Sequence, residues 1–244
     1  MKYPVLLLII LSMLTSCKSG RIQEEPARTD IDANISGKGP AVYLDFKKGP
    51  EHNHPSFVLW AEDSEGIFIQ TLFISKAVGT STYNYGDPSS GHWEPGEIRR
   101  PASLPYWSHR RNEKAPDGLY VPSLENPVAD AYTGATPPGD FGIHAKFDRD
   151  PPARIRIYFE INQTWDWNEF WTNNKYPDDD EYKTSCQPAL VYMCEVDRNN
   201  PQTVYTMNVI GHSHYAGRTG ELFTDLSTMT TALDIVGSLT LKIL

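Results

Sequence analysis

The segment from Asp130 to Thr136, with the sequence DAYTGAT, combines a carboxylate, two threonine hydroxyls and small residues. A threonine hydroxyl becomes a nucleophile once its proton is removed. Gly134 and Ala135 lack bulk and allow another protein's backbone to approach closely. The prolines at 137 and 138 end any helix and keep the stretch extended, and Asp130 could orient the hydroxyl or help to bind the metal of a modifying enzyme. The pattern therefore predicts a pliable loop that presents Thr136 for group transfer.

These residues fit the pattern Asp-x-x-(Ser/Thr)-Gly-Ala-Thr at every specified position. The pattern resembles the acceptor site of bacterial flavin transferases, where FMN becomes attached through its phosphate to the hydroxyl of the last threonine. The resemblance implies Thr136 as the acceptor and FMN, taken from FAD, as a covalent cofactor. The other residues implied to bind or present the cofactor are Asp130, Thr133, Gly134 and Ala135. Aromatic residues that lie nearby in the sequence and could supply faces for the isoalloxazine ring are Trp93, Tyr106, Trp107 and Tyr132.

The same string also has a purely structural interpretation. Residues 133–139 read TGATPPG, and threonine, glycine and proline at this density are typical of a tight turn braced by hydroxyls. Both interpretations stay open from the sequence.

The N-terminus has the organisation of a bacterial lipoprotein signal peptide. Lys2 supplies a positive charge, residues 5–14 are apolar but too short to span a bilayer, and LTSC, ending at Cys17, resembles a lipobox. We expect residues 1–16 to be removed and Cys17 to carry acyl chains such as palmitate, which hold the protein at a membrane. Lys18 follows the cysteine in place of Asp, so resemblance to enterobacterial sorting favours attachment to the outer membrane, facing the periplasm.

The fold that must position these residues is predicted to be rich in β-structure. Residues 17–40 are polar with scattered Gly and Pro, so they are expected to form the lipidated cysteine and a flexible tether. From Ala41 onward apolar and polar side chains alternate, which predicts about seven or eight strands. The residues Asp63–Gly66 are typical of a turn and predict a hairpin. The runs with strand character are 42–46, 57–62, 67–75, 154–161, 189–196, 203–210 and 238–244.

We expect residues 41–244 to form a single all-β domain, an antiparallel β-sandwich resembling immunoglobulin-like domains. Residues 79–150 are too many for an ordinary sandwich loop, so they are predicted to be a long loop insertion with a function. Short helices are predicted at 102–111, 166–171 and 226–232, the last capped by Asp225.

A wider resemblance covers about residues 41–244. The segments that carry it occur in this order: WAEDSEGIFIQTLFIS (60–75), SLPYWSHRR (103–111), ADAYTGATPPGDF (129–141) and ARIRIYFEIN (153–162). They are similar to a family of predicted periplasmic proteins called domain of unknown function 2271. The resemblance implies an extracytoplasmic all-β domain found near flavin-transfer and membrane redox genes.

Other groups of residues are weaker candidates for a site. His212 and His214 share one face of a strand and could bind zinc with other residues, yet partly buried, satisfied histidines are the favoured interpretation. The stretch 178–181 lacks the glycine of an EF-hand loop and is expected to be a solvated acidic loop. Cys186 and Cys194 can form a disulfide only across a turn, and at least one is expected to be simply buried. The other possible zinc ligands are His52, His54, His144 and Glu169.

Composition and motifs leave two function classes. The formal charge of −9 excludes a strongly basic surface of the kind that tracks nucleic-acid phosphates. The first function is a lipid-anchored, covalent FMN-bearing redox carrier without a catalytic residue of its own, with a flavin transferase and membrane redox proteins as partners. The alternative is a non-catalytic envelope module that binds a glycan or a protein through the rings of Trp165–Trp171.

Overall fold

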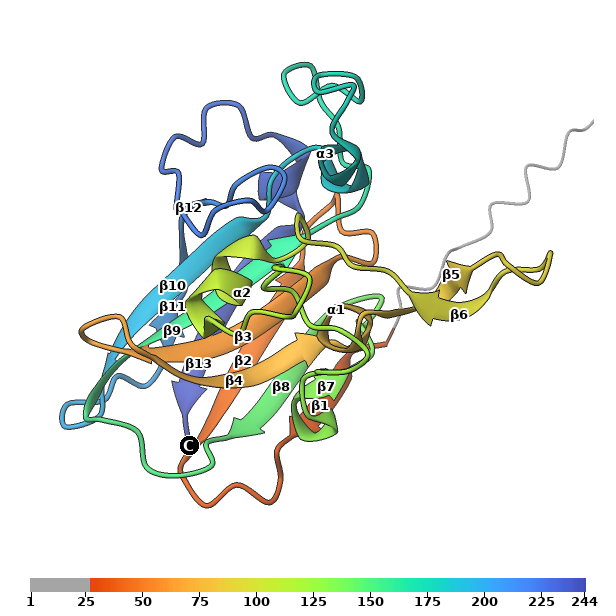
Figure 1. Ribbon diagram of the computed structural model, residues 1–244. Coiled ribbons are helices and arrows are strands. Elements are labelled where there is room, and N and C mark those ends of the chain that lie inside the picture. Colours follow the sequence, from red (N-terminus) through yellow and green to blue (C-terminus); the bar gives the residue numbers. More distant parts are fainter. Residues whose placement is uncertain (1–26) are drawn as a thin grey trace, which may run out of the picture.

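Two β-sheets stacked on one hydrophobic core form the body of the protein (Figure 1). The computed structural model describes residues 27–244, so the predicted signal peptide and Cys17 lie outside the described residues. The first sheet has the order β1(Thr29–Ala33), β8(Phe141–Lys146), β2(Ala41–Lys48), β13(Val236–Ile243) and β11(Tyr205–Thr206). The second has the order β12(Asn208–His212), β10(Leu190–Asp197), β9(Arg154–Asn162), β3(Ser56–Asp63), β4(Phe68–Ser75) and β7(Thr133–Gly134).

The alternating pattern of the sequence explains the packing between the sheets. Val42, Leu44 and Phe46 of β2 are fully buried, whereas their neighbours along the strand are partly exposed. Phe46 stacks on Phe141 of β8 with ring centroids 4.3 Å apart, and Phe57 of β3 stacks on the same ring at 4.9 Å. Aromatic pairs of this kind therefore join the two sheets across the core.

The central strands of the second sheet are buried on both faces. Six consecutive residues of β3 are buried, because α2(Pro105–Arg111) and the segment around it cover the outer face (Figure 1). Trp107 of α2 belongs to a second apolar cluster there, together with Trp60 and Tyr158 of the sheet. A strand covered on both faces has to be apolar throughout, and β3 lacks a clean alternation for this reason.

The predicted all-β sandwich with a long insertion is confirmed, and the predicted hairpin corresponds to β3 and β4. The sheets are not purely antiparallel, because β1 pairs parallel with β8 and β4 pairs parallel with β7. The prediction that the folded part starts near Ala41 is wrong, because β1 is a strand of the first sheet and lies within the predicted tether. Residues 27–244 form 13 strands, more than the seven or eight predicted, because the sequence pattern missed short strands such as β1 and β7.

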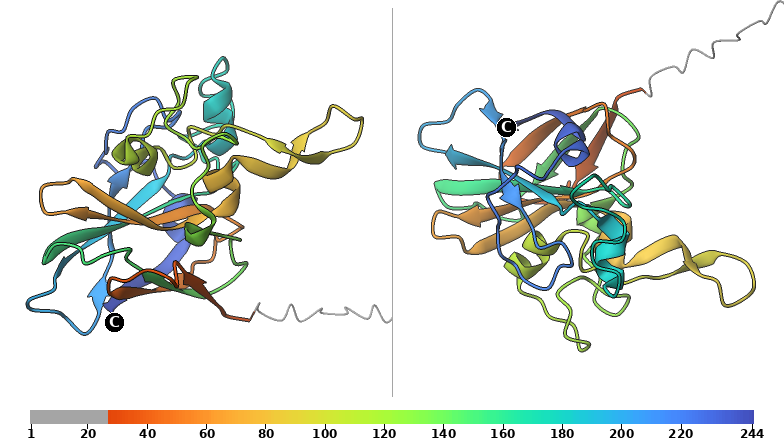
Figure 2. Two further views of the ribbon diagram at one scale, coloured as in Figure 1. Left: turned by 60° about the horizontal axis from the view of Figure 1, so that its bottom comes forward. Right: turned by 90° about the horizontal axis from the view of Figure 1, so that it is seen from above.

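The insertion contains its own elements. A two-stranded sheet of β5(Thr82–Asp87) and β6(Glu94–Glu97) projects from the body, as both views of Figure 2 show. Further elements are α1(Lys76–Thr80), α2 and the 3-10 turn η1(Asp130–Tyr132). Near the end of the predicted insertion, β8 is an internal strand of the first sheet, between β1 and β2, so the predicted loop does not extend to residue 150.

One predicted helix is confirmed and two are wrong. The helix expected at 102–111 corresponds to α2. Residues 166–171 begin with a β-bridge at Asp166 and continue as irregular backbone and bends, and residues 226–232 hold one turn and only the start of η2(Thr231–Asp234). Asn168 accounts for the first difference, because its side-chain oxygen accepts from the backbone N–H groups of Phe170 and Trp171, a local bond that competes with a helix. The sequence pattern also missed α3(Asp180–Ser185).

Candidate functional site

The acceptor-like motif lies along the edge of the second sheet. Its first part forms η1, and Thr133 and Gly134 form β7, which pairs with Ile74 and Ser75 at the end of β4. Gly134 lies so close to Phe73 that an added Cβ would be 2.8 Å from the ring. The motif is thus docked on the sheet over two residue pairs, and only glycine fits this contact.

Thr136 is held by a residue that sequence reasoning missed. Its Oγ1 lies 2.9 Å from Oγ of Ser75, and Ser75 Oγ also accepts the backbone N–H of Phe57 at 3.0 Å. After accepting the Phe57 N–H, Ser75 Oγ keeps its own proton and a second lone pair, so either hydroxyl can donate in the contact with Thr136. Ser75 can then hold Thr136 Oγ1 whether or not the threonine keeps its own proton.

Asp130 does not take the orienting role proposed for it. Its exposed carboxylate lies 3.4 Å from Nζ of Lys76 and 3.4 Å from Oγ1 of Thr133, whose hydroxyl also donates to the Asp130 carbonyl at 3.2 Å. Asp130 therefore braces η1 and β7 and leaves the hydroxyl of Thr136 to Ser75.

Thr136 borders a cavity of about 1010 Å³. Gly134, Ala135 and Thr136 form one wall, and α1 and the β5–β6 hairpin supply further walls. The remaining lining residues are Lys76, Ala77, Thr80, Thr82, Tyr83, Asn84, Tyr85, Trp93, Ile98, Arg100 and Trp165. This volume reaches the upper end of the range usual for small-molecule sites.

The aromatic lining is mostly different from the residues expected. Of the four rings near the motif in sequence, Trp93 lines the cavity, whereas Tyr106 and Trp107 belong to α2 and pack on the outer face of the second sheet. Tyr132 donates its hydroxyl to Asp148 at 2.9 Å. The rings that join Trp93 at the cavity are Tyr83, Tyr85 and Trp165.

Two cations contribute to the cavity, and their partners differ. Lys76 is engaged with Asp130. The guanidinium of Arg100 lies over the ring of Tyr83, 4.6 Å from its centroid, and Arg100 Nε is buried without a hydrogen-bond partner in residues 27–244. Burial raises the pKa of Tyr83 to about 12, against the opposing charge of Arg100, so this phenol stays neutral at physiological pH.

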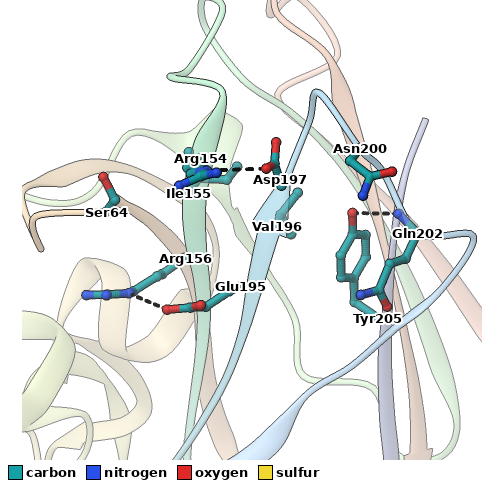
Figure 3. Close-up of a pocket in the computed structure, with 10 residues that line it drawn as sticks. All are labelled: Ser64, Arg154, Ile155, Arg156, Glu195, Val196, Asp197, Asn200, Gln202 and Tyr205. Atoms are coloured by element: carbon teal, nitrogen blue, oxygen red, sulfur yellow. Dashed lines mark hydrogen bonds and ion pairs between the residues drawn. The ribbon is translucent and has the colours of Figure 1, made fainter.

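A second cavity, of about 530 Å³, lies beside β9 and β10 (Figure 3). Its charged side chains are already paired across the strands, Arg154 with Asp197 at 3.2 Å and Arg156 with Glu195 at 3.1 Å. Tyr205 accepts the backbone N–H of Gln202 at 2.8 Å. The interactions drawn in Figure 3 thus join lining residues to one another.

His212 and His214, the pair proposed to share a zinc site, are both engaged in other contacts. His212 is buried and stacks on Phe223 at 5.4 Å, and His214 stacks on Tyr215 at 4.4 Å while its Nδ1 accepts the backbone N–H of Ala216. In the described part of the chain, no group of three or more His, Cys, Asp or Glu residues is arranged to hold a metal ion.

The acidic stretch 178–181 is more ordered than expected. Asp179 is buried, caps α3 through the N–H of Tyr182 at 3.2 Å and pairs with Arg218 at 2.6 Å. Cys186 and Cys194 are both buried and free, so the expectation that at least one is buried is confirmed.

The tryptophan-rich stretch divides into exposed and buried rings. Trp165 is 67% and Trp167 56% exposed, whereas Trp171 is 7% exposed and packs in the main core. Of these three, only Trp165 lines the larger cavity. Trp165 reaches it from a turn in which its φ is +57°, the left-handed region that few non-glycine residues adopt.

No family model, curated protein or solved structure matches this chain. Within residues 27–244, the helices are all too short or too polar to cross a bilayer.

Proposed function

We propose that this protein is a covalent FMN carrier of the cell envelope, with Thr136 as the acceptor. The observation that carries the proposal is the position of the Thr136 hydroxyl, 2.9 Å from Ser75 Oγ at the border of a cavity lined by four aromatic rings. The turn interpretation of the motif explains the docking of β7 but gives no reason for the cavity beside it.

The attachment step is a phosphoryl transfer without any change of oxidation state. Thr136 Oγ attacks the phosphorus on the FMN side of the FAD pyrophosphate, a P–O bond forms, and the bond to the AMP phosphate breaks. AMP leaves, and the threonine proton passes to a base of the transferase. Because the hydroxyl must enter another enzyme's active site, the segment has to detach from the edge of β4 during the reaction.

The lining of the cavity fits the group that would be attached. Tyr83, Tyr85, Trp93 and Trp165 present flat rings for stacking with isoalloxazine. Arg100 supplies unpaired donors, and Lys76, next to Ser75 in the chain, places a cation near Thr136. Bound FMN would supply one- and two-electron transfer, and the residues of this chain would bind and orient it.

The envelope location rests on the N-terminal sequence. A lipid on Cys17 would hold the carrier at a membrane surface, and the proposed partners are a flavin transferase and membrane redox proteins. The protein itself would catalyse no reaction in this scheme.

The test is co-expression with a flavin transferase, followed by intact-mass measurement. We expect a gain equal to FMN less one water, which the Thr136→Ala variant loses and the Thr133→Ser variant keeps, since the pattern accepts either hydroxyl residue at that position and a serine can still donate to the Asp130 carbonyl. No gain in the parent protein, or a gain that persists in Thr136→Ala, would rule out this acceptor.

A second candidate function has its own supporting observation. Tyr85, Trp93 and Trp165 are 72%, 64% and 67% exposed around the cavity, and open rings of this kind also stack on sugar faces. A non-catalytic glycan-binding module would capture oligosaccharides in an array assay, and the Trp165→Ala variant would lose capture at an unchanged melting temperature.

A further inference from the structure

Arg100 is the least satisfied cation at the cavity of Thr136. No hydrogen bond or ion pair joins its guanidinium to another residue of the described chain, and its Nε is buried without a partner. The guanidinium carbon lies over the face of Tyr83, 4.6 Å from the ring centroid. A partly buried guanidinium that lacks acceptors carries a desolvation cost that a suitable ligand would remove.

The other charged side chains around the cavity do not satisfy Arg100. Lys76 is engaged with Asp130 at 3.4 Å. Glu181 lies close enough for the charge of Arg100 to act on its pKa, but no hydrogen bond or ion pair joins the two side chains in residues 27–244, and Glu181 Oε2 is buried without a hydrogen-bond partner. The neighbouring Arg99 also has a buried Nε without a partner, but its terminal nitrogens are engaged, since it pairs with Asp117 and donates to the carbonyl of Val121 at 2.8 Å.

The contact with Tyr83 holds the guanidinium of Arg100 against an aromatic wall of the cavity. A planar fork of N–H donors beside flat rings matches a flat heterocycle with carbonyl acceptors along one edge, which stacks on the rings and accepts from the fork in the same plane. Lys76, near Thr136, is the better placed cation for a phosphate.

We infer that Arg100 is the ring-recognition residue of this cavity and binds the carbonyl edge of a planar heterocycle reversibly. The choice of isoalloxazine as this heterocycle rests on the proposed function, whereas the binding itself needs neither Thr136 nor a covalent bond. The site therefore selects the flavin ring by stacking and by donation from Arg100, before and independently of attachment.

The test uses the Thr136→Ala protein, which cannot be modified at the acceptor, and two free probes. Riboflavin and FMN share the ring but only FMN carries a phosphate. Quenching of flavin fluorescence gives the Kd of each. We expect both probes to bind, and we expect Arg100→Gln to raise the Kd of each probe tenfold or more. Arg99→Gln should change neither Kd by more than about threefold, because Arg99 is engaged outside the cavity.

Arg100→Lys serves as a second variant, because it keeps the charge and much of the packing but removes the planar fork. Arg100→Lys should also weaken the binding of riboflavin. Near-ultraviolet circular dichroism checks the folding of each variant, and if Arg100→Gln is not folded, the result for Arg100→Lys is the one that counts. The inference is overturned if neither probe binds, if riboflavin binding is unchanged in these variants, or if only FMN binding falls, which would assign Arg100 to the phosphate. Intact mass of the co-expressed parent reports separately on Thr136, so a failure of attachment and a failure of ring binding are told apart.

Discussion

Ser75 and Thr136 are 61 positions apart in the chain, and their hydroxyl oxygens lie 2.9 Å apart. The contact ties the last residue of the acceptor-like motif to the last residue of β4. Ser75 also accepts the N–H of Phe57. One buried serine thus links the edge of the sheet, the neighbouring strand and the proposed acceptor.

Removing this link should loosen the motif. In Ser75→Ala, Thr136 loses its partner and the buried N–H of Phe57 loses its acceptor, so the free energy of unfolding should fall by about 1–3 kcal/mol. Because the motif must leave β4 to enter the transferase, the initial rate of FMN uptake should rise, by up to about tenfold for about 1.4 kcal/mol of docking energy. Timed intact-mass measurements check the rate. Ser185→Ala, which removes a buried serine bond to Asn162 at 2.7 Å, should lower stability without changing uptake.

A side chain at Gly134 should displace β7. An added Cβ would lie 2.8 Å from Cε2 and Cζ of Phe73, which is closer than such atoms approach in proteins. In Gly134→Val we expect residues 130–138 to become accessible, measured as faster limited proteolysis there. Ala135→Val is the matched control, since Ala135 is exposed, and its cleavage rate should match that of the parent. Equal cleavage of Gly134→Val and the parent would contradict the docked arrangement.

The buried carboxylate of Glu62 depends on Arg110. Arg110 donates to Glu62 through Nε at 2.8 Å and through Nη2 at 2.6 Å, and the Glu62 side chain is fully buried. Arg110→Leu leaves this charge without its cation, so urea unfolding should show a loss of about 3–5 kcal/mol. The double variant with Glu62→Gln should recover part of that loss. Arg154→Ala breaks a more exposed ion pair and should lower the free energy of unfolding by at most about 1 kcal/mol. Similar losses in Arg110→Leu and Arg154→Ala would contradict the dependence of Glu62 on Arg110.

Trp171 and Trp167 should respond oppositely to truncation. Trp171 is 7% exposed and donates Nε1 to Thr228 at 3.1 Å, so Trp171→Ala should lower the free energy of unfolding by about 3–5 kcal/mol. Trp167 is exposed, and Trp167→Ala should stay within about 0.5 kcal/mol of the parent. Thermal unfolding followed by circular dichroism measures both. Loss of a ligand in Trp171→Ala would thus reflect unfolding, which makes Trp165 and Trp167 the proper test of ring stacking.

Glu160 should make stability depend on pH. Full burial raises its pKa to about 8, although its oxygens accept the N–H groups of Tyr106 at 3.0 Å and Trp107 at 2.8 Å. The folded state holds this proton more tightly than the unfolded state, whose pKa is near the ordinary 4.5. The contribution is therefore complete below about pH 4.5 and is lost as the pH rises through about 8. The melting temperature of the parent should fall over this range more steeply than that of Glu160→Gln, and parallel curves would contradict the shift.

Several elements of the fold were predictable because their signals are local. The alternation in Val42, Leu44 and Phe46 defines β2, and the turn residues after Asp63 define the β3–β4 hairpin. The strand β1 was not predictable, because its residues are mostly exposed at a sheet edge and lack an apolar pattern. Its pairing with β8 comes from backbone bonds that any sequence can make.

The candidate site was predictable only in part. The motif indicated Thr136, but its partner Ser75 lies in a strand whose sequence reads as ordinary core. The rings expected from closeness in sequence were mostly wrong, because α2 turns Tyr106 and Trp107 onto the outer face of the sheet. Trp165 lines the cavity from a loop that follows β9, 29 positions beyond Thr136. No local sequence pattern predicts that these two residues border the same cavity.

The sequence by itself determined the β-rich class, the main strands and a motif with a threonine that could be modified. These follow from local hydrophobic period, turn chemistry and residue type. The tertiary structure alone decided that β7 docks on β4, that Ser75 holds Thr136, and that Arg100, Tyr83 and Trp165 meet at one cavity. Those contacts depend on which strands become neighbours, and that choice is made by burial of the whole core.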